Sequence, residues 1–267
     1  MNNLYCLFFV ILNFYASAQR IKADRIITYE FPCMEEVDFD TLINFSSDLE
    51  KEILLSAVEK VSIKEEVRWG KKTLKKLKKD YFFDESSSTF LLVNAILSNL
   101  IANINNPMGY KYELYLMNTD EVNAHTVGGK IFVSRGIIDF CVSIDEIAFI
   151  LGHEIAHNEL GHVRDRISRF YTAQQFYYLV EDSVDLASIL TSPFDQKDEV
   201  HCDLVGVDLT ISSGYKSCSG VDLCARMDEK EKFNNWSFTK FDSHPNSAKR
   251  VACLKHHLKE NYNITCE

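Results

Sequence analysis

The amino-acid sequence predicts an α+β fold that is mainly α-helical and contains one small β-sheet. Only 10 glycines and 4 prolines occur among 267 residues, and 46% of the residues are hydrophobic, which argues against a disordered chain and a loop-rich β protein. Apolar residues recur at helical spacing along most of the chain, whereas the alternation typical of strands is confined to residues 111–133. Together these observations favour a helical domain built around a short sheet.

The N-terminal residues 1–18 are interpreted as a signal peptide. An apolar run at 4–12 is followed by small residues at 16–18, directly before Gln19. No Lys or Arg precedes the apolar run, so an uncleaved anchor or an ordinary N-terminal helix is the alternative. We therefore expect an exported protein, periplasmic or extracellular, in which residues 19–267 form a single domain.

The number of cysteines bears on the prediction of an exported protein. Of the 8 cysteines, one lies within residues 1–18, which leaves seven. An odd number in an exported protein implies at least one free thiol or an intermolecular bond. Short loops can be closed by two of the possible pairs, Cys218/Cys224 and Cys253/Cys266, with Cys33 as a rival partner. The sequence does not decide the pairing.

Helical spacing predicts the first helix after the leader at residues 39–61. The basic segment 68–79 contains six lysines and is interpreted as a solvated helix face, with a contact patch for anionic lipid or acidic protein as the alternative. Residues 86–105 form the longest apolar stretch, opened by serines suited to capping. Four polar residues interrupt this stretch, so we expect a buried amphipathic helix and not a membrane span.

The strands are predicted in the middle of the chain. One strand is expected at 111–117, and two short strands, separated by Gly128-Gly129, are expected within 122–133. A capping box at 143–146 begins the next helix. Later helices are predicted at about 172–190, 198–213, 221–231 and 247–260.

Residues 145–169 contain the pattern on which the functional prediction depends, His153-Glu154-Ile155-Ala156-His157. Residues four apart lie on one face of a helix, so the two histidines can bind one metal ion together. Glu154 can then face the water that the metal holds. The pattern also arises by chance, but here it lies in an independently predicted buried helix. Buried polar side chains need partners, and a zinc ion provides them.

A catalytic zinc ion takes three protein ligands and leaves a fourth position to water, so a third ligand is required. The residue six positions after His157 is Val163, which excludes the metzincin arrangement. His162 lies well round the helix and is interpreted as structural or as a support for a ligand, with metal ligation as the alternative. On a later helix, Glu199 can complete the zinc shell while Asp203 hydrogen-bonds a ligand imidazole. A solvated helix edge is the alternative interpretation of this pair.

A late motif, Asp242-Ser243-His244-Pro245 followed by Arg250, supplies two further candidates. His244 can donate to the oxyanion of a tetrahedral intermediate, or it can cap the metal in a resting state. Arg250 can brace that loop or a carboxylate. Both residues are therefore candidates for the same site.

Four blocks of the chain together resemble the zinc metallopeptidases of the HtpX and CAAX-prenyl-protease type, a gluzincin family (metallopeptidase family forty-eight). The blocks are 123–136 with Gly128-Gly129-Lys130, 153–162, 199–206 and 244–250. They lie within residues 110–255, over half of the chain. The resemblance implies a zincin-like fold and an endopeptidase with one Zn²⁺ ion per chain. Its implied ligands are His153, His157 and Glu199, and Glu154 is the implied general base.

The same resemblance implies that residues 131–133 are the sheet edge that lines the cleft, where a substrate can add as a strand. The substrate-binding residues implied in this way are Gly129, Ile131, Phe132 and Val133. The chain departs from the family pattern at His201-Cys202, where the family usually has Glu-Ala. We interpret Cys202 as a packed thiol, with a redox or ligand role as the alternative. The transmembrane helices of many relatives are absent, so the chain resembles the short soluble exported members.

We therefore expect a zinc-dependent endopeptidase that acts on unfolded or misfolded polypeptides, in quality control of exported or envelope proteins. The alternative is a chaperone-like or assembly factor of the same fold with gated or secondary proteolysis, in which residues 170–198 cover the cleft. A zinc hydrolase with non-peptide substrates is a third possibility without specific support. The formal net charge of −10 argues against nucleic-acid binding. Membrane-surface association through residues 68–79 is a further hypothesis.

Overall fold

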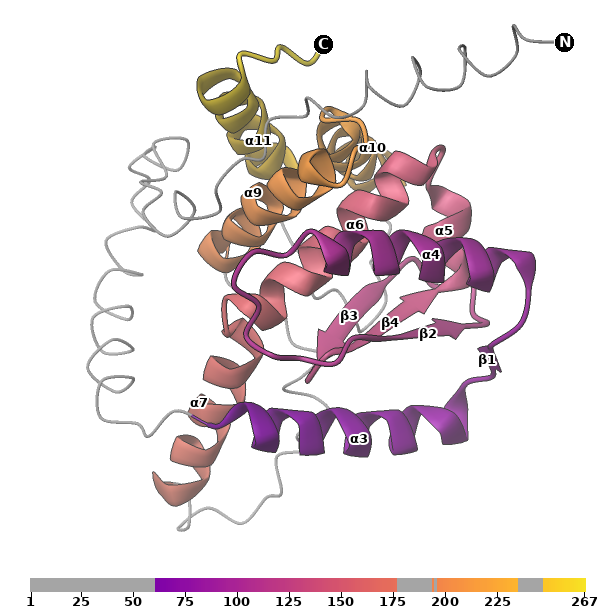
Figure 1. Ribbon diagram of the computed structural model, residues 1–267, viewed down its shortest axis with the longest axis vertical. Helices are drawn as coiled ribbons and strands as arrows, with labels where there is room; N and C mark the ends of the chain where they lie inside the picture. Colours follow the sequence, from indigo (N-terminus) through magenta and orange to yellow (C-terminus); the bar gives the residue numbers. More distant parts are fainter. Residues whose placement is uncertain (1–60, 177–193, 195, 235–246) are drawn as a thin grey trace, which may run out of the picture.

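The structure, a computed structural model, describes residues 61–176, 194, 196–234 and 247–267 (Figure 1). The predicted signal peptide, nearly all of the predicted helix at 39–61, most of the one at 172–190, and His244 lie outside these residues. No helix in the described part of the chain is long and apolar enough to cross a membrane.

The fold is α+β, mainly α, and zincin-like, as the sequence predicts. The strands are β1 (Phe83–Asp84), β2 (Glu113–Met117), β3 (Ala124–Val127) and β4 (Lys130–Ser134). The first four described helices are α3 (Ile63–Asp80), α4 (Ser88–Ala102), α5 (Arg135–Phe140) and α6 (Ile144–Glu159). The later helices are α7 (His162–Phe176), α9 (Gln196–Ser212), α10 (Ser219–Asn234) and α11 (Ser247–Tyr262).

The sheet has the strand order β1-β2-β4-β3, with β2 parallel to β4 and both outer pairs antiparallel. Strand β4 is therefore paired on both sides, and the expectation that residues 131–133 form the sheet edge is wrong. The cause is that β2 also pairs with β4, on the side opposite to β3. The two-residue turn at Gly128-Gly129, where both residues have positive φ, 59° and 79°, folds β3 back onto β4 as a tight hairpin. Among the described strands, β3 is therefore the outermost on this side.

Helix α6 is the centre of the core. Every residue from Glu146 to Asn158 is buried, so the helix is enclosed on all sides, as its apolar start predicts. It contacts β3 and β4 on the sheet, and α4, α9 and α10 among the helices. Its N-terminus is capped as expected, because the Ser143 hydroxyl accepts a hydrogen bond from the Glu146 amide at 3.3 Å. A fully buried helix of this kind holds its polar side chains in fixed positions.

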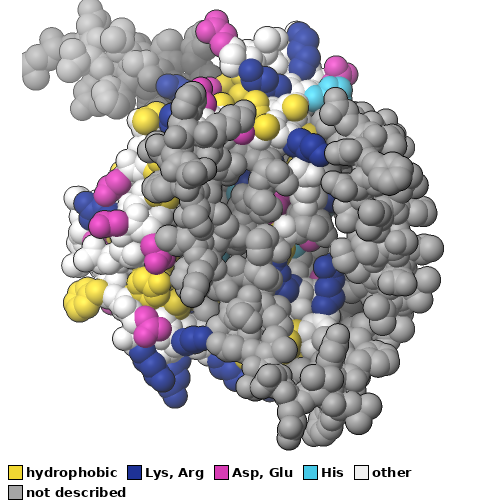
Figure 2. Space-filling model, turned by 180° about the vertical axis from the view of Figure 1, so that it is seen from behind, with side chains coloured by type: hydrophobic (Ala, Val, Ile, Leu, Met, Phe, Trp, Pro, Cys, Tyr) yellow, Lys and Arg dark blue, Asp and Glu magenta, His cyan; other side chains and the backbone are white. Residues whose placement is uncertain are grey.

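Helix α3 supports the interpretation of residues 68–79 as a solvated face. The six lysines of residues 68–79 are all exposed. Figure 2 shows dark-blue Lys and Arg side chains along the lower edge of the molecule, where α3 lies in Figure 1. The opposite side of α3 contacts β3 and α7, and the Glu66 side chain is buried there.

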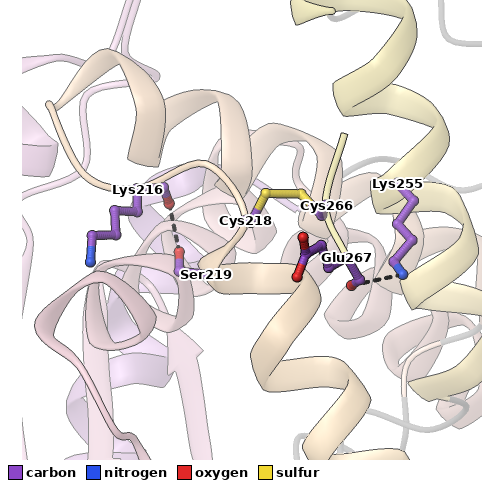
Figure 3. Close-up of a disulfide and its surroundings, with 6 residues drawn as sticks. All are labelled: Lys216, Cys218, Ser219, Lys255, Cys266 and Glu267. Carbon is purple, nitrogen blue, oxygen red and sulfur yellow. Dashed lines mark hydrogen bonds between the residues drawn. A yellow bond between two sulfur atoms is a disulfide. The ribbon is translucent and has the colours of Figure 1, made fainter. Parts of the chain in front are cut away.

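A disulfide joins Cys218, just before α10, to Cys266 in the C-terminal tail (Figure 3). Neither of the two short loops expected from the sequence is closed, because the helix pair α10 and α11 brings residues 48 positions apart together. Cys253 is also disulfide-bonded. Cys141, Cys202 and Cys224 are free thiols. Beside the disulfide, Lys255 Nζ donates to the Glu267 carbonyl at 3.0 Å, which further fixes the tail.

Candidate metal centre and active site

Helix α6 brings His153, Glu154 and His157 into the interior of the molecule, with relative exposures of 4%, 1% and 0%. The two histidines are one helical turn apart and their Nε2 atoms are 3.1 Å from each other. Two facing imidazole nitrogens at this distance need a proton or a cation between them, because two lone pairs that face each other repel. The predicted pairing of these histidines on one helix face is present in the structure.

Glu199 on α9 completes a group of three donors. Its Oε2 is 3.5 Å from His153 Nε2, and its Oε1 is 3.4 Å from His157 Nε2. The three donor atoms lie within 4.8 Å of one another, and all three side chains are buried. Ligand atoms that are each about 2.0–2.1 Å from a tetrahedral zinc ion lie about 3.3 Å apart. The residues present therefore fit a zinc ion in both donor type and spacing.

Asp203 lies one turn after Glu199 and contacts the outer nitrogen of His153, with Nδ1 and Oδ1 2.8 Å apart. Because a carboxylate only accepts, His153 carries its proton on Nδ1 and directs the Nε2 lone pair towards the other two donors. Burial raises the pKa of Asp203, but the charge and hydrogen bonds of Arg250 and the contact with His153 outweigh it, so the pKa is lowered. Asp203 is therefore an ionised acceptor.

Arg250, on α11, contacts both carboxylates of the group. Its Nε and Nη2 donate to Asp203 at 2.6 and 2.7 Å, and its Nη1 is 3.3 Å from Glu199 Oε2. Of the two partners that the sequence offers for Arg250, the carboxylate is present in the structure, and the loop with His244 lies outside the described residues. A buried pair of carboxylates needs this counter-charge, because an unpaired charge in the interior is costly.

A second set of contacts lies on the other side of His157. His162 Nδ1 is 3.3 Å from His157 Nδ1 and 3.2 Å from Cys202 Sγ. The other nitrogen of His162, Nε2, is 3.5 Å from Asp198 Oδ1. Burial, with a contribution from His201, lowers the pKa of His162 to about 3, so the imidazole is neutral near pH 7. His162, the first residue of α7, is therefore in direct contact with the metal-ligand candidate His157.

Asn158 is a residue of the site that sequence reasoning missed. Its Oδ1 accepts from the Gly129 amide at 3.0 Å, and its Nδ2 donates to Thr126 Oγ1 at 2.6 Å. These bonds tie α6, directly after His157, to strand β3 and to the turn of the β3–β4 hairpin. The only signal in the sequence is its position next to the motif. Glu66 similarly accepts from the Gly128 amide at 2.9 Å, although nothing in its sequence context indicates this.

The four residues that were expected to bind substrate are either hydrogen-bonded within the protein or buried. The Gly129 amide is used by Asn158, and the strand residues Ile131, Phe132 and Val133 are each 0% exposed. Since β4 is an interior strand, these three residues cannot receive a substrate strand by edge pairing. His244 lies outside the described residues.

Comparison with known proteins agrees with this geometry. Residues 87–258, well over half of the chain, match the family model of Peptidase family M48. The chain belongs to peptidase family M48. It is thus a metallopeptidase by family, and its motif blocks lie within or at the edge of the matched region.

Three relatives of this M48 chain are named mitochondrial metalloendopeptidase OMA1. The chain is 29% identical to the Schizosaccharomyces pombe protein over 182 residues, which cover 64% of the chain and 54% of the relative. It is 31% identical to the Arabidopsis thaliana protein over 115 residues (40% and 24%), and 25% identical to the Saccharomyces cerevisiae protein over 160 residues (54% and 46%). The chain spans about half or less of the length of these relatives.

The comparison corrects the expected location. Each of five related proteins is named as mitochondrial, so the expectation that this M48 chain is exported to the periplasm or the extracellular space is wrong. The physical reason for the error is that a short apolar run followed by small residues is a weak signal, particularly without a basic residue before it.

Proposed function

We propose that the chain is a zinc-dependent endopeptidase in which His153, His157 and Glu199 hold one zinc ion. The observation that carries the proposal is the convergence of two imidazole nitrogens and a carboxylate within 4.8 Å in the interior of an M48 peptidase. Catalytic zinc sites take three such ligands and keep a further position for water. The spacing of the donors and the orientation of His153 by Asp203 support this assignment.

The mechanism is hydrolysis of a peptide bond by an activated water. When bound, zinc polarises the substrate carbonyl and lowers the pKa of the attacking water. Glu154 takes a proton from that water as it attacks, and passes the proton to the leaving amine. Asp203 and Arg250 hold the ligands in their ionic and tautomeric states. His244 is assigned as the donor to the developing oxyanion, or as a cap on the metal at rest.

The substrate is a polypeptide, and we assign its binding to the region of β3 in place of β4. Among the described strands, β3 is the outermost one on this side of the sheet, with β4 as its neighbour. The Asn158–Thr126 hydrogen bond fixes this strand against the helix that carries the histidines. An extended peptide that lies along β3 would be held beside the reactive residues of α6. Unfolded or misfolded chains suit this mode because their backbone is available for pairing.

The names of the relatives support a mitochondrial location for this peptidase. We propose a single peptidase domain over residues 19–267. Its described part has one main hydrophobic core, which includes residues of α4, α6, α9, α10 and α11. A small satellite cluster lies between α3, β3 and α7. A role in quality control of misfolded polypeptides stays a prediction.

One observation favours the alternative of a chaperone-like factor with gated proteolysis. The ring of Phe194 stacks on His157, with centroids 4.0 Å apart and 23° between the planes. Phe194 belongs to the segment 170–198 that the sequence indicates as a cover for the cleft. Arg166 packs on the same ring, with Cζ 3.4 Å from the centroid. An aromatic ring fixed on a metal-ligand candidate is a means of limiting access.

The proposed function is tested by Glu154→Gln, with Glu159→Gln, at the end of the same helix, as the matched control. Zinc content is measured by mass spectrometry, and cleavage of an unfolded casein is followed before and after chelation. We expect wild type and Glu159→Gln to cleave, and Glu154→Gln to retain zinc without cleaving. Turnover by Glu154→Gln, or turnover that a chelator leaves intact, contradicts the mechanism. Suppression of aggregation without any turnover by wild type favours the chaperone-like alternative.

A further inference from the structure

His157 has two ring nitrogens, and each faces a different group of donors. Its Nε2 faces His153 and Glu199, the group assigned to zinc above. Its Nδ1 faces His162 Nδ1 and, beyond it, Cys202 Sγ. The donor atoms of His157, His162 and Cys202 also lie within 4.8 Å of one another.

We propose that His157, His162 and Cys202 form a second metal site, which takes a borderline or soft divalent ion such as Zn²⁺, Co²⁺ or Cd²⁺. His157 then bridges the two sites through its two nitrogens. The inference goes beyond the proposed function, although it shares His157 with it. The same chain would accordingly bind two ions and not one.

The spacing of the donors matches that of the first group. The two Nδ1 atoms are 3.3 Å apart, which is the separation of about 3.3 Å expected for two nitrogen ligands of one tetrahedral zinc ion. Cys202 Sγ is 3.2 Å from His162 Nδ1, somewhat less than the roughly 3.6 Å that a zinc–sulfur bond of about 2.3 Å would set, so the sulfur would move slightly outward on binding. Cys202 is 0% exposed and His162 is 9% exposed, so the group is shielded from competing water.

The orientation of His162 suits a ligand. Asp198 Oδ1 lies 3.5 Å from its outer nitrogen, Nε2, and a carboxylate there favours the proton on Nε2. The lone pair of Nδ1 then points into the group. Asp203 does the same for His153 in the first group, at 2.8 Å. Each group therefore contains a histidine that is oriented by an aspartate on α9.

The Nδ1 atom of His162 has two close polar neighbours in this group. A neutral imidazole nitrogen has one lone pair, yet both His157 Nδ1 and Cys202 Sγ lie within 3.3 Å of His162 Nδ1. Two donors would compete for that lone pair, whereas a cation in the middle accepts one pair from each atom. Binding replaces the thiol proton of Cys202 and the Nδ1 proton of His157 with metal bonds, and both protons pass to solvent. A thiolate with two imidazoles is a donor set that favours zinc and its softer analogues over magnesium or calcium.

The test is a titration of the metal-free full chain with Co²⁺, followed by absorption and by metal analysis. A thiolate ligand gives a near-ultraviolet sulfur-to-cobalt band, which imidazole and carboxylate ligands do not. We expect two ions per chain and this band in wild type, and one ion without the band in Cys202→Ala. Cys224→Ala, another buried free thiol, is the matched control and retains both. His153→Ala, which weakens the first group only, retains the band with one ion.

One ion per chain and no thiolate band in the wild-type protein overturns the second site and leaves the proposed function intact. Binding of no ion at all overturns both. Circular dichroism of each variant shows whether it is folded, and Cys202→Ser provides a second substitution that removes the band with little change in volume. Retention of the band in folded Cys202→Ala and Cys202→Ser also contradicts the assignment.

Discussion

Gly152 of α6 and Gly206 of α9 face each other where the two helices cross. A Cβ atom on Gly152 would lie 2.9 Å from the Gly206 carbonyl oxygen, and one on Gly206 would lie 2.8 Å from the His153 amide nitrogen. The helices thus approach backbone to backbone, directly beside His153 and one turn after Asp203. This contact sets the distance across which the two helices present their metal-ligand candidates.

Gly206→Ala is expected to separate the helices and weaken metal binding. Overpacking of this kind costs about 1–3 kcal/mol, of which the better helix propensity of Ala recovers about 1 kcal/mol. Urea unfolding and metal affinity, by competition with a chelator, measure both effects. Val205→Ala, the preceding position on α9, is the control and is expected to keep the affinity. An unchanged affinity in Gly206→Ala would show that the helix contact does not set the site.

Asp203→Asn is expected to lower metal affinity about 10–100-fold, because the His153 ring loses the acceptor that fixes its tautomer. Asp208→Asn is a close control, since Asp208 is buried on the same helix and accepts from His257 at 2.7 Å, but does not contact the ligand group. We expect it to reduce stability while metal affinity is retained. Equal losses of affinity in the two variants would contradict a specific role for Asp203.

The two ligand-bearing faces could be predicted from the sequence because they depend on helical periodicity alone. His153 and His157 are four residues apart, as are Glu199 and Asp203, and each pair shares a helix face as expected. Which helix contacts which could be inferred only from the family resemblance. The contact depends on Gly152 and Gly206, and nothing local in the sequence pairs two glycines 54 positions apart.

Strand order and disulfide pairing could not be predicted for a similar reason. The Gly128-Gly129 turn indicates a hairpin, but it does not indicate which of the two strands pairs with β2 and becomes interior. Chain entropy favours short cysteine loops, yet the packing of α10 against α11 brings Cys218 to Cys266. Both the strand order and the disulfide pairing are therefore determined by tertiary contacts.

Removing the Cys218–Cys266 disulfide with a double Ser substitution is expected to reduce the free energy of unfolding by about 4 kcal/mol. This figure follows from the chain entropy of a loop of 48 residues. Activity below the unfolding transition is expected to persist, because the bond joins the start of α10 to the C-terminal tail. Cys141→Ser, which removes a free thiol, controls for the substitution itself. A stability equal to that of wild type would contradict the prediction.

The ion pair of Glu113 with Lys130 is expected to make stability depend on acidity. Hydrogen bonds from Lys130, at 2.5 Å, and from Tyr115 lower the pKa of Glu113 from 4.5 to about 2. A carboxylate with a lowered pKa contributes stability above about pH 4.5, and this contribution is lost as the pH falls towards 2. The difference in urea midpoint between wild type and Glu113→Gln should therefore shrink over this range. Glu85→Gln, at an exposed carboxylate, should show no such trend.

The position of Arg250 in the sequence affects when the metal-ligand group can be completed during protein synthesis. Synthesis proceeds from the N-terminus, so His153, His157 and Glu199 leave the ribosome well before the guanidinium that balances Glu199 and Asp203, which lies 47 positions after Asp203. Until α11 docks, the chain holds two buried carboxylates without their counter-ion, and the ligand group cannot settle into its final charge state. We therefore expect the proposed metal site to reach its final charge state only after α11 has been synthesised.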